Sequence, residues 1–176
     1  AYFMKTPPKQ HPDSIAFSMV ERFARPGAAA PVAGRPKAKK PAAAKKAQVL
    51  TAIPGSSLWF ERGFVSYSNL AKREMLGVET ATLARHGAVS EPTARAMAEG
   101  ALAHSHADLA VAITGIAGPG GGTEAKPVGT VCFAWARRKG DTRSTTLHFP
   151  GDRAAVRRRA MAAAMQGLQG YVRETG

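Results

Sequence analysis

The sequence predicts a layered α/β/α domain with a mixed sheet, preceded by a disordered basic tail. Three observations support this prediction. Apolar strand-like runs alternate with helical segments from residue 47 to the end of the chain. The chain has 176 residues, 44% of them hydrophobic, which is enough for a single core. Residues 1–46 lack bulky apolar residues over most of their length. We therefore divide the chain into a tail, 1–46, and a domain, 47–176.

The tail carries much of the positive charge. Residues 1–47 hold ten Lys and Arg against two acidic residues, a net +8 of the chain's +13. Residues 25–47 are almost entirely Ala, Pro, Gly, Lys and Arg, and such a segment cannot bury enough apolar surface to offset the entropy of ordering. Within residues 13–23, apolar side chains recur at helical spacing, so a short helix is expected there.

Residues 35–46 are the most basic part of the tail, and two interpretations are open. Their lysines could attract nucleic-acid phosphates without reading the base sequence. Alternatively, the segment is a flexible, solvated leader whose charge has no partner. We favour the leader, because the segment carries no groups that read bases.

In the first half of the domain, the sequence predicts one strand and three helices. Ser68 or Asn69 can cap the first helix, and Gly77 can end it. Ser90 can cap the third helix, with Pro92 in its first turn. We expect the strand at 64–67 and the helices at 69–75, 79–85 and 90–106.

In the second half of the domain, the sequence predicts three strands, a glycine loop and a final helix. The loop, residues 115–122, follows an apolar run, and a turn at 139–141 separates two further strands. We expect the strands at 108–114, 128–136 and 142–149, and the helix at 151–172. The core face of that helix is expected to contain Ala155, Val156, Ala160, Met161, Ala163, Ala164, Leu168 and Tyr171.

Composition excludes several classes of protein. Cys132 is the only cysteine, which rules out an intramolecular disulfide and a multi-cysteine zinc site, and its apolar strand predicts a buried, inert thiol. His104 and His106 have no third ligand at a recognisable spacing, so we expect a solvated helix end and no metal site. No apolar run reaches the ~20 residues of a membrane span, and no signal peptide is recognisable. We expect a cytoplasmic protein.

Two features could take part in binding or catalysis by themselves. The glycine loop is neither a P-loop nor a dinucleotide-binding motif, but its backbone N–H groups could approach an anion closely. Ser57 lies in a turn, and Lys72 follows Tyr67 by five residues. A lysine can activate a serine nucleophile when burial or a nearby cation lowers its pKa. The spacing alone assigns neither residue a role.

Several motifs, taken together, carry more information than their spacing. They follow one another in a fixed order over about residues 49–172, and in this order they resemble the CinA C-terminal domain family. The motifs are Ile53-Pro-Gly-Ser-Ser-Leu-Trp-Phe-Glu-Arg-Gly-Phe-Val-Ser-Tyr-Ser-Asn-Leu-Ala-Lys72, Leu76-Gly-Val78, His86-Gly-Ala-Val-Ser-Glu91, Thr114-Gly-Ile-Ala-Gly-Pro119, Lys126-Pro-Val-Gly-Thr-Val131 and Phe149-Pro-Gly-Asp-Arg153.

The resemblance implies an activity and a set of site residues. Stand-alone members of the family hydrolyse the carboxamide of nicotinamide mononucleotide to the acid and ammonia, in pyridine-nucleotide recycling. They need no metal or organic cofactor, and they are commonly homo-oligomers. The family's functional positions correspond here to the nucleophile Ser57, the base Lys72, and to Tyr67, Thr114 and Arg153.

The resemblance also implies a mechanism. Neutral Lys72 takes the proton of Ser57, which attacks the amide carbon to form an acyl-enzyme that water hydrolyses. Tyr67 orients the lysine or relays the proton. Thr114 and Gly115, with the loop that follows, hold the oxyanion or carboxamide. Arg153 contacts substrate and helps to lower the pKa of Lys72.

One part of the family pattern is missing. Members carry a strand and then Glu-Ser-Cys-Thr-Gly-Gly before the Gly-Ser-Ser motif, whereas residues 40–47 here read Lys-Pro-Ala-Ala-Ala-Lys-Lys-Ala. A missing strand would leave the sheet with a gap or an unpaired edge. A frame-shifted or mis-joined coding sequence and a true paralogue with an altered ligand both explain this. The alternative function is therefore a catalytically impaired member that binds nucleic acid or an acidic partner through its basic tail.

Overall fold

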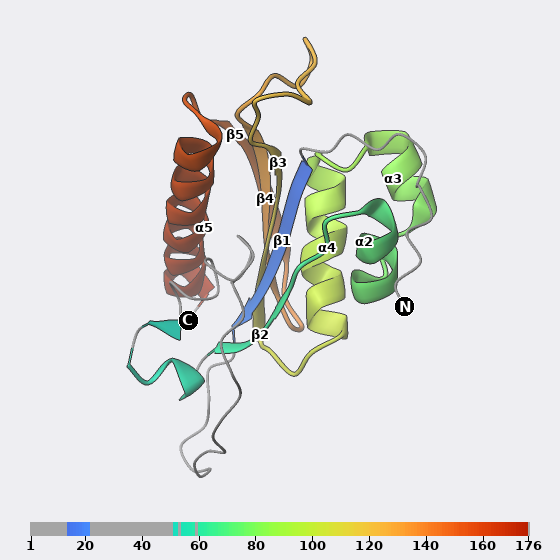
Figure 1. Cartoon of the computed structure of the whole chain (residues 1–176). Helices are drawn as coiled ribbons and strands as arrows, with labels where there is room; N and C mark the ends of the chain where they lie inside the picture. The colour runs from blue at the N-terminus through green and yellow to red at the C-terminus, as the bar shows by residue number, and fades with distance from the viewer. Residues whose placement is uncertain (1–13, 22–50, 53, 59, 176) are drawn as a thin grey trace, which may run out of the picture.

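The computed structural model describes residues 14–21, 51–52, 54–58 and 60–175. These residues form a five-stranded sheet in the order β2-β1-β3-β4-β5, together with helices (Figure 1). In chain order, the elements are β1 Ser14–Glu21, the 3-10 turn η1 Ser56–Leu58, β2 Phe60–Phe64, α2 Asn69–Leu76, α3 Thr80–His86, α4 Glu91–Ala103, β3 Leu109–Ile116, β4 Thr130–Arg137, β5 Thr142–His148 and α5 Arg153–Thr175.

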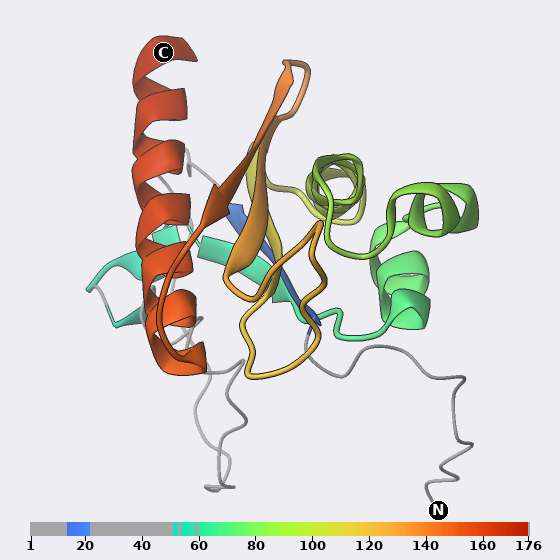
Figure 2. The ribbon, with the colours of Figure 1, turned by 90° about the horizontal axis from the view of Figure 1, so that it is seen from above.

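The predicted layered α/β/α arrangement is confirmed. Helices α2, α3 and α4 lie on one side of the sheet, and α5 lies on the other (Figures 1 and 2). The expected mixed sheet is wrong for the described residues, because all four ladders are antiparallel. The reason is the connectivity: β3, β4 and β5 reverse direction one after another, and β1 runs opposite to both of its neighbours.

Strand β1 corrects the expectation for the start of the chain. The helix expected at 13–23 is wrong, since Ser14–Glu21 is a strand that pairs with β2 on one edge and with β3 on the other. Ala16 lies opposite Thr114, and Ser18 lies opposite both Phe64 and Ala112. The sheet consequently has no gap between β2 and β3, and it includes residues from before the expected boundary at 47. The basic residues 35–46 lie outside the described part of the chain.

A second signal in the sequence agrees with β1 as a strand. The larger apolar residues Ile15, Phe17 and Met19 recur with a period of two, which is typical of a strand. The same eight residues also fit a helical spacing. Pairing with two neighbouring strands makes this segment a strand and not a helix. A short apolar run is ambiguous on this point without its partners.

The predicted caps of α2 and α4 are confirmed, whereas α4 ends at Ala103, earlier than the expected 106. The Ser68 hydroxyl accepts a hydrogen bond from the Ala71 N–H at 3.0 Å, and Gly77 ends α2 in the left-handed region with φ 66°. Ser90 caps α4 by accepting from the Thr93 N–H at 3.3 Å. The strand expected at 64–67 lies earlier, at Phe60–Phe64, because polar Glu61 and Arg62 hide the strand pattern in this edge strand.

Two apolar clusters cover the two faces of the sheet. One packs α4 and parts of α2 and α3 against it, and the other packs α5. The predicted core face of α5 is largely confirmed: Ala155 and Ala163 are half-buried, and the other members are buried. Trp135 donates to the Ala164 carbonyl at 3.0 Å, and Gly167 leaves room for its ring. The buried members are Val156, Ala160, Met161, Ala164, Leu168 and Tyr171.

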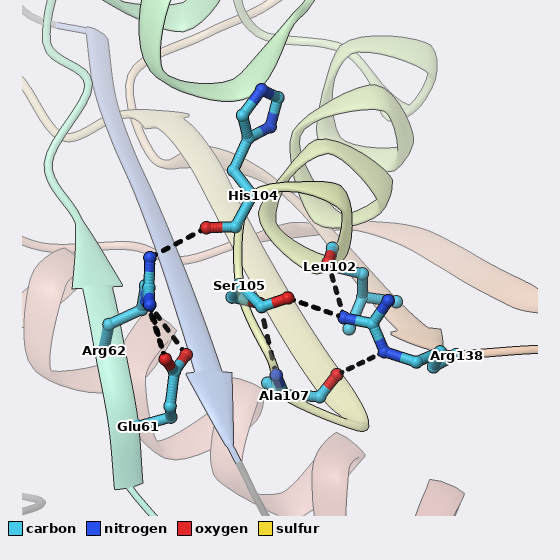
Figure 3. A network of polar contacts seen from close by, with 7 residues as sticks. All are labelled: Glu61, Arg62, Leu102, His104, Ser105, Ala107 and Arg138. Carbon is cyan, nitrogen blue, oxygen red and sulfur yellow. Dashed lines mark hydrogen bonds and ion pairs between the residues drawn. The ribbon is translucent and has the colours of Figure 1, made fainter.

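Arg138, directly after strand β4, hydrogen-bonds to the end of α4 and to the segment that follows it (Figure 3). Arg138 donates to the carbonyls of Leu102 at 2.6 Å, Ser105 at 2.9 Å and Ala107 at 2.9 Å. Arg62 of β2 donates to the His104 carbonyl at 2.9 Å. The last carbonyls of a helix have no i+4 partner within the helix. The two arginines donate to one such carbonyl, that of Leu102, and to three carbonyls of the segment that follows α4.

We expect Arg138→Met to destabilise the fold by about 2 kcal/mol, because three carbonyls lose a charged donor while the apolar stem is kept. Thermal unfolding should show a midpoint lowered by about 4–8 °C. Arg158→Met on the exposed side of α5 is the matched control, since it removes the same charge. Equal midpoints for the two variants would show that the carbonyl contacts contribute nothing.

Candidate active site

Lys72 is the most unusual side chain in the described structure. It projects from α2 and is fully buried, with 0% of its surface exposed. Its Nζ donates to the backbone carbonyl of Tyr67 at 3.5 Å, a long hydrogen bond. Burial disfavours the charged ammonium and lowers the pKa of Lys72 from 10.5 to about 8. An amine of this kind is neutral in an appreciable fraction of molecules near neutral pH, so it can accept a proton.

Burial is the cause of this shift. Removal from water accounts for the direction of the shift without a neighbouring cation. The expected contribution of Arg153 to the pKa of Lys72 stays a prediction. Arg153 begins α5, which lies on the opposite side of the sheet from α2 (Figure 1).

A second polar group is buried just ahead of α2. Ser66 is 0% exposed, and among the described residues its Oγ is the buried side-chain atom that lacks a hydrogen-bond partner. Sequence reasoning missed this residue, and no pattern in the sequence distinguishes it from other serines in turns. Its burial depends on how the segment from β2 to α2 packs. The segment thus combines a buried hydroxyl and a buried amine.

Tyr67 lies between these two groups. Its side chain is 49% exposed, and its backbone carbonyl accepts the hydrogen bond from Lys72 Nζ. The structure therefore brings Tyr67 and Lys72 together through the main chain of Tyr67. The expected orienting role of this residue is compatible with that contact, and a relay through its phenol stays a prediction.

Thr114 and Gly115 lie near the end of β3. Thr114 is fully buried, and its hydroxyl donates to the Ala88 carbonyl at 2.6 Å, which ties the strand to the loop before α4. Gly115 faces Val131 across the ladder, where an added Cβ would come within 2.8 Å of Val131 Cγ2. Glycine is thus needed for the close approach of these strands. The oxyanion role of both residues stays a prediction.

Two basic side chains hold the glycine loop in place. Arg153 donates through Nη1 to the Gly118 carbonyl at 2.9 Å, so α5 begins against the loop. Lys126, four residues after the loop, donates to the carbonyls of His86 at 3.0 Å and Val89 at 2.7 Å. The structure therefore brings Arg153 together with the loop that follows Thr114 and Gly115.

The segment that carries Ser57 lies apart from helix α2. Its backbone belongs to η1, which packs against β2. Figures 1 and 2 show this short teal segment on the side of the sheet that carries α5, whereas α2 lies on the side that carries α4. The views place the segment that carries Ser57 and the helix that carries Lys72 on different sides of the sheet. The roles of Ser57 as nucleophile and Lys72 as base stay predictions.

The described residues offer no obvious metal centre. Among them, no group of three or more His, Cys, Asp or Glu side chains could hold an ion. His104 Nδ1 lies 2.8 Å from the Gly100 carbonyl at the end of α4. Cys132 is buried as expected, and burial raises the pKa of its thiol. Within the described ranges, no helix is both long and apolar enough to cross a membrane.

Comparison with known proteins gives consistent matches. A family model described as the CinA C-terminal domain matches residues 43–172. A curated relative from Escherichia coli K12, named nicotinamide-nucleotide amidohydrolase PncC, is 60% identical over 122 residues, which cover 69% of this chain and 74% of the relative. A CinA-like protein from Akkermansia muciniphila is 55% identical over 122 residues, which cover 69% of this chain and 30% of that longer protein.

Solved structures with the same fold are also similar in sequence. The competence/damage inducible protein CihA from Agrobacterium tumefaciens superposes with a TM-score of 0.70 at 47% identity, covering 72% of this chain and 77% of that chain. A competence-damaged protein (CinA) superfamily protein from Escherichia coli gives a TM-score of 0.67 at 39% identity, covering 71% and 72%.

Proposed function

The chain belongs to the CinA C-terminal domain family, and we propose that it hydrolyses the carboxamide of nicotinamide mononucleotide to nicotinate mononucleotide and ammonia. The name of its 60% identical relatives, nicotinamide-nucleotide amidohydrolase, supports the substrate class. The observation that carries the proposal is Lys72, a fully buried amine whose pKa is lowered to about 8. Amide hydrolysis needs a base of this kind, because a hydroxyl nucleophile must lose its proton.

The proposed chemistry has two stages. Lys72 in its neutral form accepts the proton of the Ser57 hydroxyl, and the serine oxygen attacks the carboxamide carbon. Collapse of the tetrahedral intermediate breaks the C–N bond, and the protonated Lys72 returns its proton to the departing ammonia. Lys72 then activates a water that attacks the ester, which releases the acid and restores Ser57. Neither stage consumes a cofactor.

The remaining residues have supporting roles in this proposal. The Tyr67 carbonyl fixes the direction of the Lys72 amine through the hydrogen bond to Nζ. Thr114 and Gly115 lie near the end of β3, and the glycine loop that follows accepts a hydrogen bond from Arg153 at the Gly118 carbonyl. Backbone N–H groups of that loop hold the oxyanion or the carboxamide. We also propose that the protein acts in the cytoplasm as a homo-oligomer.

The test is ammonia release from nicotinamide mononucleotide by the purified chain, measured beside Ser57→Ala. We expect release by the wild type and a loss of at least about a thousandfold in the variant, since a covalent nucleophile is removed. Ser56→Ala is the matched control, because it removes a hydroxyl from the adjacent position of η1. It should keep most of the activity.

The opposite outcome has a definite meaning. If the wild type unfolds cooperatively but releases no ammonia, the amidase proposal is wrong. The family's upstream Glu-Ser-Cys-Thr-Gly-Gly segment is then required for catalysis. Salt-dependent retention on DNA by the same sample, lost on deletion of residues 35–46, would then favour the binding function.

A further inference from the structure

We propose that Ser66 is a positioning residue for Lys72. Its buried hydroxyl accepts a hydrogen bond from the Lys72 amine and so sets the direction from which the amine takes up a proton. The inference rests on the proposed function, since Lys72 is the base assigned there. Ser66 itself has no part in the mechanism given above.

The hydrogen bonds of the buried polar side chains single out Ser66 and Lys72. The buried threonine hydroxyls each donate to a backbone carbonyl at 2.6 or 2.7 Å. Lys72 Nζ has only the long 3.5 Å contact with the Tyr67 carbonyl, and Ser66 Oγ has no partner. The two groups whose hydrogen-bonding capacity is unmet are thus close together in the chain. Among the described residues, the buried polar or charged side chains are Ser66, Lys72, Thr93, Thr114 and Thr130.

Both side chains face the same layer of the molecule. Burial alternates along residues 64–67, where Phe64 and Ser66 are buried and the other two are exposed, so Ser66 points inward on the side of Phe64. Leu76 lies one turn after Lys72 on the buried face of α2. Phe64 and Leu76 belong to the same apolar cluster, which lies between the sheet and α4. The hydroxyl and the amine therefore enter the same layer.

The Tyr67 carbonyl keeps the amine near Ser66. Tyr67 follows Ser66 directly, and its carbonyl oxygen accepts the hydrogen bond from Lys72 Nζ. Ser66 and Lys72 are not hydrogen-bonded to each other in this structure. Rotation of the serine side chain, or one water between the two groups, completes the bond. A buried polar group without a partner is costly, and this one bond relieves both groups.

A second acceptor has a chemical consequence for the base. A neutral amine has two N–H groups and one lone pair. The Tyr67 carbonyl takes one N–H, which leaves two positions for the lone pair. When Ser66 takes the other N–H, the lone pair has a single direction. The same acceptor also stabilises the charged ammonium, so Ser66 opposes the effect of burial on the pKa of Lys72.

Ser66→Thr and Ser66→Val form a matched pair for the test, because the two side chains have the same shape and differ in the hydroxyl. We measure kcat and KM for ammonia release from nicotinamide mononucleotide as functions of pH. Ser66→Val should lower kcat about tenfold and leave KM within about twofold, since a hydrogen bond to the base is lost. Its rate should also rise at lower pH than in the wild type, by at least about half a unit.

The hydroxyl of Ser66→Thr should keep kcat and the pH of the rise close to the wild-type values. Ser66→Ala removes the hydroxyl without adding volume and should behave like Ser66→Val. It provides the comparison with the wild type if both larger side chains prevent folding, which thermal unfolding shows.

A titration that does not depend on activity gives the second readout. The protein is labelled with ¹³C at the lysine Cε atoms, and the NMR signal of Lys72 is the one that Lys72→Met lacks. We expect the pKa of Lys72 to be lower in Ser66→Ala and Ser66→Val than in the wild type. The charged side chains on α2 and on α4, which packs against it, are the same in all variants, so the difference reports the hydroxyl. They are Arg73, Glu74, Glu91, Arg95 and Glu99.

Two results would overturn the inference while leaving the proposed function intact. One is an active Ser66→Ala with the kcat and the Lys72 pKa of the wild type. The other is the same kcat and the same Lys72 pKa in Ser66→Thr and Ser66→Val, which would leave Ser66 a role in packing alone. A wild type that releases no ammonia would instead contradict the proposed function, and the titration still decides whether Ser66 hydrogen-bonds to Lys72.

Discussion

Lys72→Met should reduce ammonia release from nicotinamide mononucleotide by about 10³-fold or more, because the base that accepts the serine proton is lost. The wild-type rate should also rise with pH through about 8, the pKa of the buried amine, since only neutral Lys72 accepts a proton. Initial rates between pH 6.5 and 9.5 measure both effects. A variant that keeps wild-type activity, or keeps the same rise near pH 8, would contradict the assignment of the base.

The stability of the same variant separates lost chemistry from lost folding. The pKa of Lys72 is lower in the folded chain than in the unfolded one, so the unfolded state binds more protons between pH 8 and 10.5. The contribution of Lys72 to stability therefore rises with pH across that window and is unfavourable below it. Lys72→Met removes this dependence and should be at least as stable as the wild type at pH 7. Urea unfolding of both proteins at pH 7 and 9.5 gives the comparison.

Gly100→Ala should produce the largest loss of stability, about 3 kcal/mol or more. Gly100 lies in α4 where the end of α2 crosses it, and an added Cβ would meet the Leu76 carbonyl oxygen well inside contact distance. That oxygen belongs to the backbone of α2, so the helix itself must move. Alanine favours a helix over glycine by about 1 kcal/mol, and the clash outweighs this gain. Chemical unfolding measures the loss.

Gly170→Ala is the matched control for this substitution. Gly170 is also inside a helix, α5, but an added Cβ there meets nothing within 4 Å. The same change should therefore stabilise the protein by up to about 1 kcal/mol. If Gly100→Ala behaves like Gly170→Ala, the close crossing of α2 and α4 is not a feature of the protein in solution. Displacement of α2 should also lower activity, because that helix carries Lys72.

Most of the local structure could be predicted from the sequence. Ser68, Gly77 and Ser90 were identified as helix ends because capping chemistry is local: a hydroxyl reaches an N–H three residues away, and glycine adopts positive φ. The buried face of α5 followed from helical periodicity for the same reason. The burial of Cys132 followed from its apolar strand. Each of these properties depends on residues that are neighbours in the chain.

Properties that depend on contacts between distant parts of the chain could not be predicted in this way. Ser14–Glu21 is a strand because β2 and β3 lie on either side of it, although its spacing also fits a helix. The direction of every ladder and the burial of Ser66 likewise depend on residues far away in the sequence.

The sequence by itself determined the family, the helix caps and the identity of the candidate catalytic residues. Motifs and caps depend on residues that are close together in the chain. Only the tertiary structure decided that Lys72 is buried, that burial lowers its pKa, and that α2 and η1 lie on different sides of the sheet. The pKa of an amine depends on how much water surrounds it, and that depends on packing between elements distant in the chain. The position of Ser57 relative to Lys72 depends on the layers in the same way.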